Sequence, residues 1–262
     1  MVDNGSMDNT LSLVSKEYPE VQVIENNKNI GFGQANNIGV RLALENHATH
    51  IFLLNQDAAI QPDTLIKCLD VFQLKPNIAL LSPIHLNGKG DSLDLGFQSC
   101  LTAKLCPDYV SDLVLGSIKE SYKIFSVNAA AWLLKADILK QIGLFSDLFF
   151  HYGEDINFQQ RLWYHGYEAH LSPKAFIYHD REFRQGEKSE TGKKHEIKTN
   201  QMTILLNIQD TYSLALKKLL KYAGLLVFQG KPISGMSILF DTLVNNAKYK
   251  KAREDFKKGI SI

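Results

Sequence analysis

The chain has 262 residues, 45% of them hydrophobic and 22% charged, and a formal net charge of +1 at pH 7. That composition is typical of a globular protein long enough to bury a substantial core. The polar first residues and the lack of a run of about 18 apolar residues lead us to expect neither a secretory leader nor a membrane-spanning helix. Cys68, Cys100 and Cys106 form no CxxC pair, so we expect free thiols rather than a disulfide or a metal site.

The charge is unevenly distributed along the chain. Residues 1–180 carry 13 Lys and Arg against 20 Asp and Glu, whereas residues 181–262 carry 16 against 8. An acidic first part suits a site built from carboxylates, and a basic second part suits an anionic surface such as membrane headgroups or an acidic partner. The change indicates two parts, which we place at residues 1–185 and 186–262.

The first 86 residues alternate predicted helices and strands. The chain opens on one apolar residue and a turn cluster at residues 3–6, which normally closes a strand, although almost no strand precedes it. The elements predicted next are a helix over residues 8–17, a strand over 21–24, a helix over 36–45, a strand from residue 50, a helix over 62–74 and a strand over 78–86. Strands separated by helical patterns of this length indicate β-α-β units and a parallel sheet.

The remainder of the chain is predicted to be irregular at first and helical at its end. Residues 87–122 are expected to be irregular, with a weak strand signal at 95–98. Next come a strand entering a helix over 127–143, a helix over 155–165 and a final strand over 170–180. A mobile loop is expected over 182–196, followed by helical residues 196–247 that break near 230–232.

The most informative local motif is LLNQD, in which Asp57 directly follows a predicted apolar strand. In open α/β sheets, ligands bind at the carboxyl ends of the strands. A carboxylate held there is well placed to bind a divalent metal ion. The alternative is a helix cap, but four residues separate Asp57 from Pro62 at the start of the next helix, which is too far for an N-cap.

Three further patterns carry candidate residues with weaker signals. Glu154 and Asp155 precede a helix, where they supply either a general base or simple helix capping. His179 follows a strand and is either a metal ligand or a structural histidine. Gly31 and Gly33 precede a helix whose N-terminus could hold phosphate, although an ordinary strand-to-helix turn would look the same.

Taken in order, these motifs resemble those of glycosyltransferase family 2. They are VDNGSxDxT, NxGFGxANNxG, LLNQD, VNAAAWLL and FFHYGEDxxFxxRLWYHGY, followed by a strand that ends in His179. The resemblance covers residues 1–185 and looks closest to a rhamnosyltransferase-like bacterial branch that builds surface polysaccharides. It implies an α/β protein of the GT-A fold, a nucleotide-binding αβα sandwich with a mainly parallel sheet, to which we add a C-terminal helical segment.

The resemblance also implies roles for individual residues. Asp57 matches the last acid of a motif that binds Mn²⁺ or Mg²⁺ on the donor diphosphate, and Asn55 replaces the first acid of that motif. Asp155, beside Glu154, matches the base that deprotonates the acceptor hydroxyl, and His179 matches a further metal ligand. The positions matching the nucleotide-sugar pocket are Asp3, Asn4, Asn29, Gly31, Gly33, Asn36, Asn37 and Asn55.

The implied activity is transfer of a sugar, rhamnose or another hexose, from a nucleotide-sugar to a saccharide or lipid-linked acceptor in cell-surface polysaccharide synthesis. One base and no covalent intermediate imply inversion at the anomeric carbon. The alternatives are a catalytically impaired GT-A-like binding or assembly subunit and a sugar-phosphate nucleotidyltransferase, whose phosphate signature is not visible here. In family members the opening turn closes the second strand, so we also expect a sheet that lacks the first strand and helix and exposes unpaired backbone.

The basic C-terminal part has two interpretations. Residues 214–230 and 245–258 either form a helical subdomain that packs on the core or dock peripherally on anionic membrane near a lipid-linked acceptor. We expect a cytoplasmic protein, peripheral at the inner face of the cell membrane, with no nucleic-acid partner. A homo-oligomer is left open.

Overall fold

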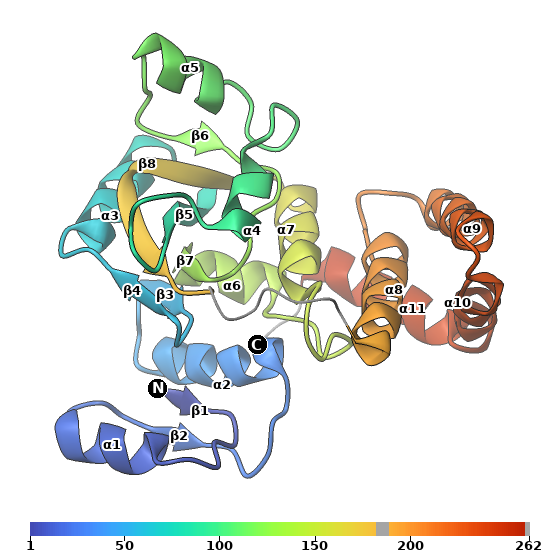
Figure 1. Cartoon of the computed structure of the whole chain (residues 1–262), viewed down its shortest axis with the longest axis horizontal. Coiled ribbons are helices and arrows are strands. Elements are labelled where there is room, and N and C mark those ends of the chain that lie inside the picture. Colours follow the sequence, from blue (N-terminus) through green and yellow to red (C-terminus); the bar gives the residue numbers. More distant parts are fainter. Residues whose placement is uncertain (182–188, 260–262) are drawn as a thin grey trace.

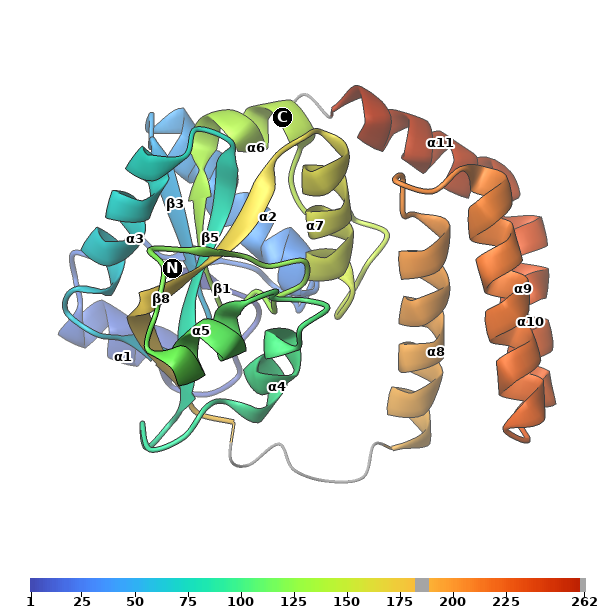
Figure 2. The same ribbon diagram turned by 90° about the horizontal axis from the view of Figure 1, so that it is seen from above.

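The computed structural model describes residues 1–181 and 189–259. A part centred on β-sheet comes first and a helical part follows, and the two lie side by side (Figures 1 and 2). The predicted boundary between residues 185 and 186 lies outside the described residues.

A small parallel sheet stands at the N-terminal end of the chain. It pairs β1 (Val2–Asp3) with β2 (Ile24–Glu25), and α1 (Thr10–Glu17) connects the two strands. The next helix, α2 (Phe32–Glu45), contacts both β1 and the first strand of the main sheet (Figure 1). Among the described residues, no strand pairing joins the small sheet to the main sheet.

The main sheet has the order β3-β7-β5-β8-β4, and β6 also pairs with β8. Its strands are β3 (His50–Leu54), β4 (Ala58–Ile60), β5 (Ile78–Asn87), β6 (Tyr122–Lys123), β7 (Ala131–Lys135) and β8 (Glu168–His179). β5 and β8 pair in parallel, and the other pairs of this sheet are antiparallel.

The α/β class is therefore confirmed, but the prediction of a mainly parallel sheet is wrong. β3 and β5 do run in the same direction, as expected for strands joined through α3 (Thr64–Leu74). However, β7 lies between them and is antiparallel to both. Sequence periodicity predicts the direction of consecutive strands, but not which later strand will be inserted between them.

Further helices surround the sheet and build the C-terminal part. Around the sheet lie α4 (Leu95–Gln98), a 3₁₀ turn (Ser99–Leu101), α5 (Tyr109–Leu115), α6 (Ala136–Ile142) and α7 (Glu154–Tyr164). The C-terminal part holds α8 (Glu190–Leu205), α9 (Tyr212–Phe228), α10 (Pro232–Val244) and α11 (Asn246–Lys258). The break predicted near residues 230–232 is confirmed, because Pro232 begins α10.

Two local predictions are wrong. The weak strand signal at residues 95–98 belongs to α4, because the Asp94 carboxylate accepts the backbone N–H of Phe97 and caps a helical turn there. The loop predicted over 182–196 is already helical from Glu190, where the Ser189 hydroxyl caps α8. Residues 182–188 of that prediction lie outside the described residues.

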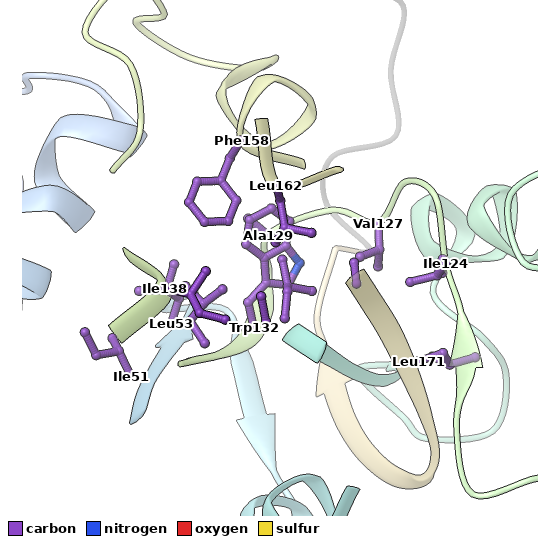
Figure 3. Close-up of a cluster of buried hydrophobic side chains, with 14 of the residues drawn as sticks. Ile51, Leu53, Ile124, Val127, Ala129, Trp132, Ile138, Phe158, Leu162 and Leu171 are labelled. Atoms are coloured by element: carbon purple, nitrogen blue, oxygen red, sulfur yellow. The ribbon is translucent and has the colours of Figure 1, made fainter. Parts of the chain in front are cut away.

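The core of the sheet part fixes the position of α7. Trp132 on β7 is fully buried, and Phe158 and Leu162 of α7 point toward it (Figure 3). The ring centroids of Trp132 and Phe158 are 5.8 Å apart. Burying these large side chains together holds the helix against the sheet, so the N-terminus of α7 has a fixed place beside the strand ends.

The C-terminal helices form a second core and return to the first. α8, α9 and α10 run side by side, and α11 crosses back toward α7 (Figure 2). At that crossing the Arg161 guanidinium lies over the Phe256 ring, 5.0 Å from its centroid, and the His165 ring is 2.8 Å from the Phe256 carbonyl. The C-terminal residues thus form helices that pack on the sheet part, and the membrane interpretation stays a prediction.

No helix among the described residues is long and apolar enough to cross a membrane.

Candidate active site

Asp57 and His179 meet where β3 and β8 end. Asp57 follows β3 and immediately precedes β4, whose first residue, Ala58, is paired with His179 on β8. This pairing brings a carboxylate oxygen of Asp57 to 3.3 Å from Nε2 of His179. The backbone confirms the register, because the Asp180 N–H donates to the Asp57 carbonyl at 2.9 Å.

The His179 ring is held in one tautomer by its neighbours. Arg181 donates from Nε to Nε2 of His179 at 3.2 Å, so Nε2 is the acceptor and the proton of the neutral ring is on Nδ1. Nδ1 faces a carboxylate oxygen of Asp94 at 3.6 Å. Burial and the Arg181 charge lower the pKa of His179, against the opposing effects of Asp57 and Asp94, so the ring is neutral at pH 7.

This geometry fits a cation between Asp57 and His179. The Nε2 lone pair and a carboxylate oxygen are both acceptors, and they face each other at 3.3 Å. Adjacent ligands of an octahedral ion with bonds of about 2.1 Å lie about 3 Å apart. No group of three or more His, Cys, Asp and Glu suited to a metal occurs in the described part of the chain.

The N-terminus of α7 carries the two adjacent carboxylates. Gly153 enters the helix with φ +90°, and Glu154 and Asp155 form its first turn. Glu154 is buried, and burial together with the Asp155 charge raises its pKa to about 7. Burial also raises the pKa of Asp155, although backbone N–H groups, that of Ile156 foremost, oppose the shift. Asp155 is the more exposed of the two, so it is the better placed to meet a substrate.

The buried thiol of Cys100 is influenced by the charges of both Asp155 on α7 and Asp94 near His179. Burial raises the pKa of the Cys100 thiol, and the charges of Asp155 and Asp94 add to that effect. Both carboxylates therefore lie within electrostatic range of one buried thiol. The thiol itself is buried and un-ionised at neutral pH, which agrees with a structural role.

Several residues predicted to bind the nucleotide-sugar are joined to one another by hydrogen bonds. Asn4 accepts the Ile30 N–H at 3.0 Å, and its amide donates to the Asn29 side chain at 3.0 Å. The Asn29 side chain in turn accepts the Gly31 N–H at 2.9 Å. Asp3 accepts the N–H groups of Gly5 and Ser6, and the Ser6 hydroxyl and N–H lower the pKa of Asp3. The end of β1 and the glycine loop are thus held together.

The glycine loop lies directly against the segment that leads into α7. A Cβ atom on Gly31 would lie 2.1 Å from the Phe150 carbonyl oxygen, and Gly31 has φ +92°. A Cβ atom on Gly33 would lie 2.9 Å from Cβ of Phe145 and 3.5 Å from Cβ of Glu154. Both glycines are therefore required for close backbone approach, which places the loop beside the start of α7.

The remaining predicted pocket residues are engaged elsewhere. Asn37 is buried, and its amide both donates to the Phe145 carbonyl at 2.8 Å and accepts the Phe145 N–H at 3.0 Å, so it clamps the chain. Asn36 donates to the Phe32 carbonyl within α2. The Asn55 N–H donates to the Ala130 carbonyl at 2.9 Å, and its own carbonyl accepts the Ala58 N–H at 3.1 Å across the turn that holds Asp57. The amides of Asn36 and Asn37 therefore both have partners within the chain, and their place in the nucleotide-sugar pocket stays a prediction.

Three residues of the site were not predicted. Asp94, Asn128 and Arg181 surround Gly96, whose missing side chain leaves room for all three: a Cβ there would lie between 3.0 and 3.5 Å from each. Asp94 reaches the site because residues after β5 fold back, with the Asp94 N–H donating to the His85 carbonyl at 2.9 Å. In the sequence it lies in residues 87–122, a segment expected to be irregular.

Comparison with known proteins gives one family and a common fold. The family model described as "Glycosyl transferase family 2" matches residues 1–142. A sequence comparison with curated proteins finds no significant match. Among solved structures, a crystal structure of GalNAc-T7 with UDP, GalNAc and Mn²⁺ is similar, with a TM-score of 0.55 and 14% identity over 77% of this chain and 41% of that chain. TarS of S. aureus is similar with a TM-score of 0.54 and 15% identity over 86% and 36% of the two chains.

This chain spans about two fifths of the length of those two proteins, and at such low identity they show the shared GT-A fold alone. The match to the family model extends over more than half of the chain and includes the glycine loop, the LLNQD motif and the strand β7. The chain belongs to glycosyl transferase family 2.

Proposed function

We propose that this chain transfers a sugar from a nucleotide-sugar donor to a hydroxyl of a saccharide or lipid-linked acceptor, with inversion at the anomeric carbon. The observation that carries the proposal is the approach of Asp57 to His179, at 3.3 Å, where β3 and β8 end, together with the Asp155 carboxylate in the first turn of α7. A cation site and a carboxylate base are the two groups that such a transfer requires. Neither group depends on the other for its position, because one is held by the sheet and the other by α7.

Asp155 acts as the base in this proposal. An acceptor hydroxyl is a poor nucleophile, and a carboxylate within hydrogen-bond reach accelerates its attack by accepting the proton. Burial raises the pKa of Asp155, which makes its carboxylate a stronger base than that of an exposed aspartate. Glu154, next to it in the first turn of α7, is buried, and its pKa is raised to about 7.

Asp57 and His179 would hold a divalent ion, Mn²⁺ or Mg²⁺, and the chemistry that this ion would supply is neutralisation of the negative charge of the leaving group. Their mixed carboxylate and imidazole set suits Mn²⁺. Asp94 faces Nδ1 of His179, which suits a proton on that nitrogen, and Arg181, which donates to Nε2, would have to give up that hydrogen bond for Nε2 to bind the ion. The structurally similar GalNAc-T7 was crystallised with UDP and Mn²⁺, which supports a nucleotide diphosphate and a metal as the donor pair.

The loop clasped by Asn4 and Asn29 lies beside the start of α7, and we assign it to the nucleotide end of the donor. Rhamnose or another hexose as the sugar, and cell-surface polysaccharide as the product, are proposed from the resemblance of the motifs to a rhamnosyltransferase-like branch. A lipid-linked acceptor would bring the reaction to a membrane surface.

The test is nucleoside diphosphate release from a panel of UDP-, GDP- and dTDP-sugars with Mn²⁺, with and without saccharide acceptors. We expect acceptor-dependent release that EDTA abolishes. Asp155→Asn should lower it by about 10²-fold or more, because the base is lost. Asp63→Asn, at an exposed carboxylate paired with Lys67, is the matched control and should change nothing.

The outcomes separate the alternatives. Full activity in Asp155→Asn, with unchanged thermal stability, would contradict the assigned base. Donor binding without turnover would identify a binding or assembly subunit. Formation of a nucleotide-sugar from a nucleoside triphosphate and a sugar phosphate would identify a nucleotidyltransferase.

A further inference from the structure

An apolar stripe runs along the outer face of α10. Its members are each exposed to between 66% and 83%, although all are large apolar side chains. The stripe consists of Ile233, Met236, Phe240, Leu243 and Val244. Their spacing of three, four, three and one residues places them on one side of the helix. We call these five residues the α10 stripe.

The fold itself does not use the α10 stripe. The opposite side of α10 already packs against the other helices through Gly235, Ile238 and Thr242, which are buried. A Cβ atom on Gly235 would lie 2.8 Å from the Ala223 carbonyl of α9, so the two helices are in close contact there. Exposing five large apolar side chains in one stripe is unfavourable in water, so the stripe indicates a surface that is covered in use.

The surface beside the α10 stripe is basic. α9 carries three lysines and no acidic residue. Lys218 pairs with Asp210 at 2.7 Å, whereas Lys217 and Lys221 are exposed one turn apart. Lys231 directly precedes α10 and is also exposed. Between residues 211 and 259 the chain has ten Lys and Arg against three Asp and Glu.

The single acidic residue of α10 does not offset this charge. The Asp241 carboxylate pairs with Lys198 of α8 at 2.6 Å and accepts the Tyr249 hydroxyl of α11 at 2.6 Å. These bonds direct it inward, to the junction of three helices. The outer side of the α9–α10 hairpin is therefore apolar and positively charged, without an exposed carboxylate of its own.

We propose that the α9–α10 hairpin docks on an anionic lipid bilayer, with the α10 stripe at the boundary between headgroups and acyl chains. Lys217, Lys221 and Lys231 then meet the lipid phosphates, whose negative charge attracts basic residues near the bilayer surface. At 13 residues α10 is about 20 Å long, so it lies along the bilayer plane. A second copy fits less well, because an isologous contact through this face would place the same lysines opposite one another.

Docking on a bilayer would favour a lipid-linked acceptor as the substrate class. Only this choice of acceptor rests on the proposed function. Vesicle binding needs neither donor nor acceptor. A chain that binds vesicles but transfers no sugar would thus support the docking and contradict the proposed function.

The test is co-flotation of the full chain with vesicles of phosphatidylcholine alone and with about 30% phosphatidylglycerol. We expect binding to the anionic vesicles to be at least about tenfold tighter, and to weaken at about 0.5 M NaCl. Replacing Met236 and Phe240 together by Ser should weaken it by about tenfold or more, because buried apolar area is lost. The matched control replaces Val114 and Leu115 of α5, which are equally exposed, by Ser and should leave binding unchanged.

A charge series completes the test. Lys217→Glu with Lys221→Glu should weaken binding to anionic vesicles only, whereas Lys140→Glu on α6 should not. Equal binding to neutral and anionic vesicles, or binding unchanged by the Met236 and Phe240 substitutions, would overturn the proposal. So would a wild-type dimer that binds no vesicles and becomes monomeric when Met236 and Phe240 are replaced, because a second copy would then cover the stripe.

Discussion

At the scale of single residues, the site depends on carboxylates whose surroundings differ. Asp3 is surrounded by hydrogen-bond donors, which lower its pKa, whereas Glu154 is buried beside another acid, which raises its pKa to about 7. Oε2 of Glu154 is buried without a hydrogen-bond partner among the described residues. An ionised Glu154 therefore destabilises the folded state, directly beside Asp155, the proposed base.

This makes the stability of the protein depend on pH through Glu154. The folded pKa of about 7 exceeds the ordinary 4.5, so the folded state favours the protonated acid. Its contribution is fully present below pH 4.5 and is lost as the pH rises to 7. Glu154→Gln should raise the free energy of unfolding by up to about 3 kcal/mol at pH 8.5, and by little at pH 4.5, in urea titrations.

Glu168→Gln is the control with the opposite sign. Burial raises the pKa of Glu168, but its hydrogen bonds with Lys123 and His170 outweigh that effect and lower it overall. Its neutral variant should therefore lose stability at neutral pH and not gain it. An identical pH profile for Glu154→Gln and the wild-type chain would contradict the burial of an unpaired acid.

At the scale of elements, local sequence signals predicted where helices begin and end, but not which distant segments lie next to each other. The helix predicted over residues 155–165 is found over Glu154–Tyr164, and α6 ends before Gly143 as expected, because caps and periodicity are local properties. Asp57 and His179 were predicted separately as strand-end residues. Asp94 could not be predicted, because its place depends on a turn that folds residues after β5 back against β8.

The glycine loop offers a test at this scale. Gly31→Ala should lower the free energy of unfolding by at least about 2 kcal/mol, because φ is +92° and the new Cβ would overlap the Phe150 carbonyl. Gly166→Ala has a similar φ of +83° with nothing within 4 Å, so it reports the backbone strain alone, about 1 kcal/mol. Urea titrations that give equal losses for both variants would show that the loop does not contact the segment before α7.

At the scale of the whole molecule, α11 joins the two cores. Phe256 packs in the C-terminal core and against the Arg161 guanidinium of α7. Arg161 is itself buried and donates to the carbonyls of Ile142 and Leu144, so the contact reaches the turn after α6. The amphipathic pattern of the C-terminal residues predicted helices, but not this contact, since it joins residues far apart in the chain.

We therefore expect the two parts to unfold together. Both tryptophans, Trp132 and Trp163, lie in the sheet part, so fluorescence reports that part, while far-ultraviolet circular dichroism also reports the C-terminal helices. The two urea transitions should coincide. Phe256→Ala should shift both transitions to lower urea, because the free energy of unfolding falls by about 3 kcal/mol. A shift in circular dichroism without one in fluorescence would show that the parts are independent.

The most direct test of the whole account is calorimetric binding of nucleoside diphosphates with and without Mn²⁺. If Asp57 and His179 hold a cation on the donor diphosphate, Mn²⁺ should tighten binding to the wild-type chain by about tenfold or more. Asp57→Asn and His179→Ala should each abolish that gain while the chain stays folded. Binding of equal strength with and without Mn²⁺ in all three proteins, or no binding of any nucleoside diphosphate, would contradict the account.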